Sequence, residues 1–186
     1  LKQIGARRLE TCFAEANGQA DDGQPKPFVE TGMYKRSLKT LREKLAGLEV
    51  SAEIRGKLQG KKLLIACTDV HEYGKQLVGA LLKKAGAQVL DLGCSVDAAQ
   101  LTKCMRDERP DALCLSTNNG LALSYAEELL QCCEKAHVSI PIVMGGHLNE
   151  DNGTDLPVDV TEELHERNIR TSEEIEGLLS VVASLF

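Results

Sequence analysis

Residues 62–67 read KLLIAC, and the residues that follow, 68–74, read TDVHEYG. A short apolar run bounded by polar residues predicts a buried β-strand at 62–67. The next residues, Tyr73–Ala85, have helical periodicity, and Gly86 ends that helix in the way a C-terminal glycine does. A buried strand that passes through a short polar loop into a helix is the opening unit of a parallel sheet.

The same alternation continues to the end of the chain. We expect further strands at 87–92, 110–116, 140–144 and 168–170, and helices at 97–108, 121–136, 158–167 and 172–184. Asp97 stands where the first of these helices needs an N-cap. This order of elements predicts an α/β domain over 60–186. Its expected form is a Rossmann-like (flavodoxin-like) parallel sheet with helices on both faces.

Residues 1–59 differ in texture and are expected to be a helical extension or linker. Residues 1–16 look helical, residues 17–33 are rich in Gly, Asp and Pro, and residues 34–58 return to helical periodicity. Within the last segment, four leucines form one apolar stripe, at Leu38, Leu41, Leu45 and Leu48. That stripe must pack either on the following domain or on a partner protein.

Bulk properties exclude several classes of partner. The 186 residues carry a formal net charge of −6, which should repel nucleic-acid phosphates. No apolar run approaches the roughly 20 residues of a membrane helix, and no segment reads as a secretory leader. The seven Cys residues are odd in number and lack Cys-x-x-Cys spacing, so we expect free thiols and a cytoplasmic location. Leu1 in place of Met leaves open a processed start or a piece of a longer polypeptide.

Parallel sheets bind ligands beyond the carboxyl ends of their strands, so the loop after 62–67 is the first to consider. His71 lies in that loop, and Asp69 is close enough in sequence to accept the proton of its far ring nitrogen. Such a bond fixes the tautomer and makes the other nitrogen a better metal ligand. Gly74 lets the backbone approach a bulky ligand. The alternative is a solvated surface loop in which Asp69 caps the helix.

Two further strand ends carry small and polar residues. The third strand ends in Ser116-Thr117-Asn118-Asn119-Gly120, which can admit a planar or phosphate-bearing ligand or can simply cap the next helix through Ser116 or Asn119. The fourth strand ends in Gly145-Gly146-His147, which suits a ligand lying flat against the backbone or an ordinary tight turn.

In combination, the three loops form one ordered pattern. Asp-x-His-x-x-Gly at 69–74 is followed by 41 residues, then Ser-x-x at 116–118, then 26 residues, then Gly145-Gly146. This pattern resembles that of the cobalamin (vitamin B12)-binding domains of corrinoid methyltransferase proteins and adenosylcobalamin mutases. The resemblance covers residues 61–186 and implies cobalamin as the cofactor.

In that family the nucleotide tail of the cofactor swings away from cobalt into a slot between the sheet and its helices, and a His takes its place. The resemblance implies that His71 is the lower cobalt ligand, supported by Asp69, and that Ser116 hydrogen-bonds the displaced tail or its surroundings. Gly145 and Gly146 would make room for that tail. The remaining expected contacts are Thr117 and Asn118 in the slot, Val70, Glu72 and Tyr73 near the lower corrin face, and His147 at the tail or a propionamide. Asn118 departs from the Leu often found in the family.

The resemblance leaves the reaction open between two classes. A methyl carrier would hold methylcobalamin and meet a methyltransferase protein, whereas a mutase fragment would hold adenosylcobalamin beside a separate catalytic domain. Lys75 and the Asp91-Leu92-Gly93 end of the second strand resemble the methyl carriers. Residues 1–59 are short for the helical bundle of those carriers, and a linker from a mutase or methyltransferase barrel is the alternative. A cobalamin-dependent sensor is a third option. In each case the chain is expected to need a partner to complete a reaction.

Overall fold

The computed structural model describes residues 39–186 apart from 41, 42, 44, 154, 155 and 173. The chain divides into two compact units, 1–36 and 37–186, and all described residues belong to the second unit. The expected helix at 1–16 and loop at 17–33 therefore lie outside the described residues.

A five-stranded parallel sheet forms the centre of this unit, as the sequence predicts. The strand order is β2-β1-β3-β4-β7, and every neighbouring pair is parallel. This is the flavodoxin-like order, in which the chain leaves β1 and β3 toward opposite faces and opens a crevice between their carboxyl ends. The strands are β1 (Lys62–Cys67), β2 (Gln88–Asp91), β3 (Ala112–Thr117), β4 (Ile142–Gly146) and β7 (Ile169–Ser172).

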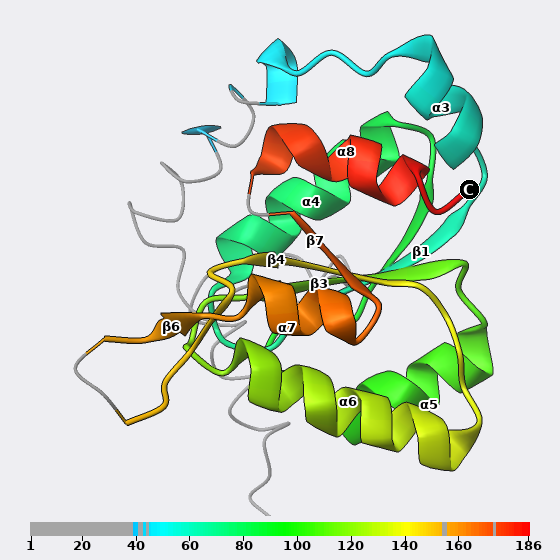
Figure 1. The fold of residues 1–186 in the computed structure, drawn as a ribbon. Helices are drawn as coiled ribbons and strands as arrows, with labels where there is room; N and C mark the ends of the chain where they lie inside the picture. Colours follow the sequence, from blue (N-terminus) through cyan, green and yellow to red (C-terminus); the bar gives the residue numbers. More distant parts are fainter. Residues whose placement is uncertain (1–38, 41–42, 44, 154–155, 173) are drawn as a thin grey trace, which may run out of the picture. The chain divides into compact units, whose positions relative to one another are not determined.

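Helices cover both faces of the sheet, which confirms the predicted α/β layering. Helices α4 (Glu72–Lys84) and α8 (Ile175–Ala183) lie on one face, and α5 (Ala98–Glu108) and α6 (Ala122–Ala136) lie on the other (Figure 1). The short helix α7 (Thr161–Glu166) packs beside β7. Asp97 caps α5 as expected, because its side chain accepts a hydrogen bond from Gln100 N at 2.7 Å.

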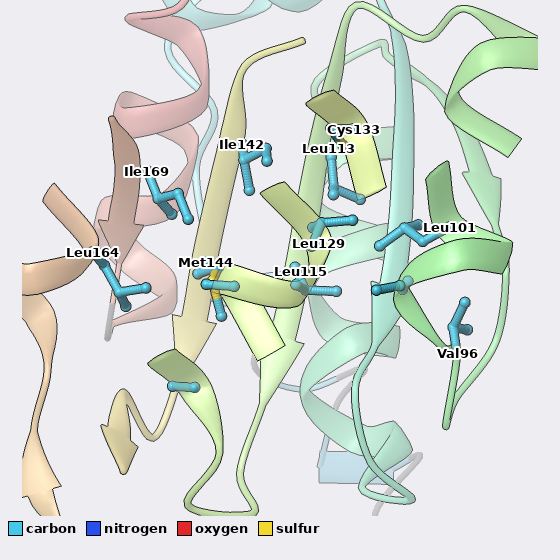
Figure 2. Close-up of a cluster of buried hydrophobic side chains, with 14 of the residues drawn as sticks. Val96, Leu101, Leu113, Leu115, Leu129, Cys133, Ile142, Met144, Leu164 and Ile169 are labelled. Carbon is cyan, nitrogen blue, oxygen red and sulfur yellow. The ribbon is translucent and has the colours of Figure 1, made fainter. Parts of the chain in front are cut away.

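Alternate residues of each central strand feed two separate cores. On the α5–α6 face, Leu113 and Met144 pack with helix residues such as Leu129, as Figure 2 shows. On the α4–α8 face, Ile65 and Val143 belong to the second core. Burial on both faces explains why these strands read as continuous apolar runs rather than as alternating ones.

The helical segment before β1 packs on the second core. Helix α3 (Ala52–Leu58) begins at the N-cap Ser51, whose hydroxyl accepts from Ile54 N, and it ends in the fully buried Leu58. Of the leucine stripe, Leu45 and Leu48 pack against the same core, whereas the two preceding leucines lie outside the described residues. The described half of the stripe, Leu45 and Leu48, therefore meets the following domain, and a boundary at 59/60 remains a prediction.

Two segments near the carboxyl edge differ from expectation. The helix predicted from Val158 is wrong at its start, because Val158–Asp159 (β6) pairs antiparallel with Asn149–Glu150 (β5). Residues 149–150 thus form a short strand. Helix α6 is capped neither by Ser116 nor by Asn119. Instead, the Glu150 carboxylate accepts bonds from the backbone N–H groups of residues 123 and 124 and from the Ser124 hydroxyl.

The Cys residues of the described region are free thiols. Burial raises the pKa of the Cys67 thiol to about 12, and it has the same effect on Cys114. Both thiols are therefore protonated at neutral pH and act mainly as small apolar groups. Among the described residues, the helices are too short or too polar to cross a lipid bilayer.

Candidate functional site

A cavity of about 590 Å³ lies between the sheet and the α4–α8 layer. Its inner wall is apolar and comes from three strands and two helices, through Ile65, Leu77, Val78, Cys114, Val143, Ile175 and Leu178. Its outer part reaches the carboxyl ends of β1, β3 and β4 and is lined by His71, Ser116, Asn118, Gly145, Gly146 and His147. The three loops that the sequence singled out therefore converge on one cavity, at the edge where α/β sheets bind ligands.

The Asp69–His71 pair is present at the mouth of this cavity. His71 Nδ1 lies 2.8 Å from Asp69 Oδ1, and the same carboxylate oxygen accepts the backbone N–H of His71 at 2.7 Å. With the Nδ1 proton donated to Asp69, the lone pair of Nε2 is free. The His71 side chain is 63% exposed whereas that of Asp69 is 6% exposed, so the carboxylate is enclosed and the imidazole faces outward.

Asp69 also ties two loops together. Its second oxygen, Oδ2, accepts the backbone N–H of Asn118 at 2.6 Å. Asp69 thus bonds His71 within the loop after β1 and Asn118 in the loop after β3. It does not cap α4, as the alternative interpretation required. Because the Asn118 contact comes from the backbone, the departure from Leu at this position leaves the bond unaffected.

These bonds keep Asp69 charged. Burial alone would raise the pKa of its carboxyl group, but the N–H groups of His71 and Asn118, the His71 ring and the Cys67 thiol favour the carboxylate, so the pKa is lowered. Cys67 Sγ lies 3.5 Å from Asp69 Oδ1. An ionised Asp69 draws the His71 proton to Nδ1 and strengthens the electron-donating character of Nε2.

Ser116 presents a hydroxyl to the cavity. The residue is 8% exposed, and its Oγ makes no hydrogen bond to any described residue. Water or a ligand in the cavity can therefore bond this hydroxyl. Ser116 therefore marks the place where a ligand that enters the cavity finds a polar partner.

Of four other predicted site residues, three lie outside the cavity wall and one lies in it. Thr117 is fully buried, and its hydroxyl donates to Asn119 Oδ1 at 3.3 Å, so it does not line the slot as expected. Val70 is 76% exposed, and Glu72 begins α4; both lie outside the cavity wall. Tyr73 is partly exposed and does line the cavity.

Gly145 and Gly146 are required by the sheet itself. A Cβ at Gly145 would lie 2.5 Å from Ser172 O on the neighbouring strand, and a Cβ at Gly146 would lie 2.2 Å from Thr117 O. Gly146 also has a φ of +104°, which L side chains rarely adopt. The expected reason, room for a ligand, is therefore joined by a second one: the strands come too close for a side chain.

We expect Gly146→Ala to lower the free energy of unfolding by about 3 kcal/mol, from an unfavourable φ and a clash with backbone. Urea denaturation measures this value. Gly153→Ala is the control, because Gly153 also has a positive φ, of +78°, but has nothing within 4 Å of its added Cβ. That control should lose only about 1 kcal/mol. Equal losses in the two variants would show that the close strand contact is unimportant.

Sequence reasoning missed several residues of the site. The helix residues of the inner wall, Leu77, Val78, Ile175 and Leu178, belong to ordinary amphipathic helices, whose apolar faces do not distinguish cavity from core. Ser172, the last residue of β7, and Glu174, just before α8, also line the cavity.

The amino-acid sequence of this chain is similar to those of two known proteins. The methanol–corrinoid protein of Methanosarcina barkeri is 31% identical over 115 residues, which is 58% of this chain and 43% of that protein. The HTH-type transcriptional repressor CarA of Myxococcus xanthus is 34% identical over 89 residues, which is 47% of this chain and 31% of the repressor. The chain thus spans less than half the length of these relatives.

Two solved structures share the fold. The methanol:cobalamin methyltransferase complex MtaBC from M. barkeri matches 77% of this chain and 50% of the solved chain, with a TM-score of 0.55 and 18% identity. A cobalamin-binding protein from Desulfitobacterium hafniense matches 99% of this chain and 93% of its own, with a TM-score of 0.56 and 17% identity. The sequence profile of the B12 binding domain matches residues 64–161, which include Asp69, His71, Ser116 and both glycines. This chain therefore belongs to the B12-binding domain family and resembles the corrinoid proteins of methyltransferase systems.

Proposed function

We propose that this chain binds cobalamin base-off and His-on and presents it to a methyltransferase protein, as the corrinoid carrier of a methyl-transfer system. The observation that carries the proposal is the Asp69–His71 bond at the mouth of the cavity. This bond orients one imidazole nitrogen, and the cavity beside it offers a slot for the detached nucleotide tail.

The residues of the site fit this cofactor. Cobalamin would bring its other cobalt ligands with it, so the His71 imidazole is the metal ligand that this chain would supply. The cavity has an apolar inner wall for an aromatic base and, on Ser116, a hydroxyl for a polar atom of the tail. His147 is exposed at the cavity edge and can reach the tail phosphate or a propionamide.

When bound, the corrinoid supplies the methyl-transfer chemistry at its cobalt. The protein supplies the lower ligand and its orientation. His71 would bind cobalt through Nε2, Asp69 would hold the proton on Nδ1, and Gly74 would let the start of α4 approach the ring. Val70, Glu72 and Tyr73 would lie beneath the corrin. Its upper face would be left for the partner protein.

The relatives support methyl transfer over the other roles. The longer of the two reported matches is to a methanol–corrinoid protein, and a solved methyltransferase complex shares the fold. The other relative, CarA, is a transcriptional repressor. A repressor's role is less favoured for the present chain, because its net charge of −6 disfavours direct contact with DNA. An adenosylcobalamin mutase remains the alternative that experiment must separate.

Reconstitution tests the proposal directly. The purified chain is titrated separately with methylcobalamin and adenosylcobalamin, and absorption and EPR spectra are recorded. We expect both forms to bind base-off, with a nitrogen splitting from His71 in the Co(II) form, and the methyl form to bind more tightly. Tighter binding of the adenosyl form would favour the mutase. Failure to bind either form would overturn the proposal.

A further inference from the structure

Lys75 is a buried cation beside the proposed cofactor site. It lies in the first turn of α4, is 2% exposed, and lines the cavity. Its Nζ is 2.5 Å from Asp91 Oδ1 and 3.9 Å from Glu72 Oε1. A buried ammonium group is costly unless it is paired and hydrogen-bonded. The Asp91 carboxylate is therefore the group that makes this position of Lys75 tolerable.

Asp91 connects the ammonium to a tight loop. It is the last residue of β2, and the oxygen that meets Lys75 also accepts the backbone N–H of Gly93 at 2.8 Å. Gly93 has a φ of +92°, and Ser95, only two residues later, has a φ of +53°. A non-glycine residue in the left-handed region persists only where surrounding contacts hold it. The loop at 93–96 is thus shaped by the Asp91 carboxylate from one side.

On its other side, this loop holds the segment that leads to the proposed cobalt ligand. Cys67 N donates to Gly93 O at 3.0 Å, and Val96 N donates to Cys67 O at 3.2 Å. Ser95 N donates to the backbone carbonyl of Asp69 at 3.0 Å. The backbone of Asp69 is therefore fixed by a loop that depends on Asp91.

Lys75 ties the other end of the loop between β1 and α4 to Asp91. His71 immediately precedes α4, and the N-terminus of that helix has no side-chain cap from its N-cap residue. The ion pair between Lys75 and Asp91 joins the first turn of α4 to the end of β2. Both flanks of the ligand loop, the Asp69 backbone and the start of α4, are thus tied to a single carboxylate.

We propose that the Lys75–Asp91 ion pair positions His71 for cobalt, and that this pair controls how fully the imidazole occupies the axial site. This inference rests on the proposed function. Neither residue touches Nε2, so both act as positioning residues. Without the pair, the Asp69–His71 loop keeps its own hydrogen bonds but loses its fixed place relative to the sheet, and the imidazole should exchange between bound and unbound positions.

The test compares Lys75→Met with the wild-type chain, each loaded with Co(II) cobalamin. We expect Lys75→Met to bind cobalamin about 5- to 10-fold more weakly, near the lower end of effects seen for outer partners of metal ligands. We also expect its EPR spectrum to contain a second, His-off species without nitrogen splitting. Lys62→Met is the matched control. Lys62 starts the same strand that leads to His71 but pairs with Glu108, at 2.7 Å, at the opposite end of the sheet.

Asp91→Ala is the second variant, because it removes the other half of the pair; since it leaves the buried Lys75 ammonium without its carboxylate, the melting temperature is measured beside the spectrum. It should give the same mixed spectrum. If both variants lower the melting temperature yet keep a wholly His-on spectrum, the pair has only a structural role and the inference is wrong. If the wild-type chain itself lacks the nitrogen splitting, the proposed function fails instead.

Discussion

Replacing His71 with Ala is expected to weaken cobalamin binding by roughly 100-fold and to abolish the axial-nitrogen splitting in the Co(II) EPR spectrum. Loss of an outer partner of a metal ligand already costs roughly 10–100-fold in affinity, so loss of the ligand belongs at the upper end of that range. The His71 ring is 63% exposed, and its described hydrogen bond runs to Asp69, so its removal should disturb the fold little.

Binding should not vanish altogether, because the cavity wall and Ser116 remain in the variant. Isothermal titration of the folded protein measures the affinity, and EPR of the Co(II) form reports the axial ligand. Asp69→Asn should give an intermediate result, with the splitting retained and the affinity lowered by roughly 10-fold. His147→Ala provides the control, because this second exposed imidazole also lines the cavity. If the splitting survives in His71→Ala but not in His147→Ala, the ligand has been assigned to the wrong histidine.

The parts of the fold that the sequence predicts well depend on neighbouring residues. The bounds of β1, Lys62–Cys67, agree with the prediction, because a continuous apolar run between polar residues has few other interpretations. The N-cap Asp97 is likewise a local signal, since it bonds an N–H group three residues away. Most other helices and strands begin or end a few residues from their predicted bounds, because helix and strand ends are the least sharply defined parts of these elements.

The parts that the sequence does not predict depend on contacts between distant residues. Asn118 N meets the Asp69 carboxylate across 49 residues, and Glu150 bonds Ser124 in the first turn of α6 from 26 residues away. Lys75 and Asp91 each appeared in the sequence as separate points of resemblance, with nothing to show that they form one ion pair. Spacing identifies the loops that meet, whereas the bonds between them depend on how the strands align.

The cavity is the second determinant of affinity, and filling it should separate tail binding from cobalt ligation. Val78 lines the cavity from α4 and is only partly buried, so Val78→Phe can place a ring in that space while the helix remains intact. We expect Val78→Phe to weaken cobalamin binding by roughly 10- to 100-fold, because forcing a base into an occupied slot costs about 1–3 kcal/mol. Cobinamide, which lacks the nucleotide tail, should bind within about twofold of its wild-type affinity.

Val181→Phe is the matched control. Val181 lies on α8 and packs against the same core as Val78, but it does not line the cavity, so both corrinoids should keep their affinities. The ratio of cobalamin to cobinamide affinity is the decisive quantity, because a general loss of stability would weaken both ligands together. An unchanged ratio in Val78→Phe would mean that the nucleotide tail lies outside this cavity. His71 could then still bind cobalt, but the base-off geometry would have to place the tail elsewhere on the protein.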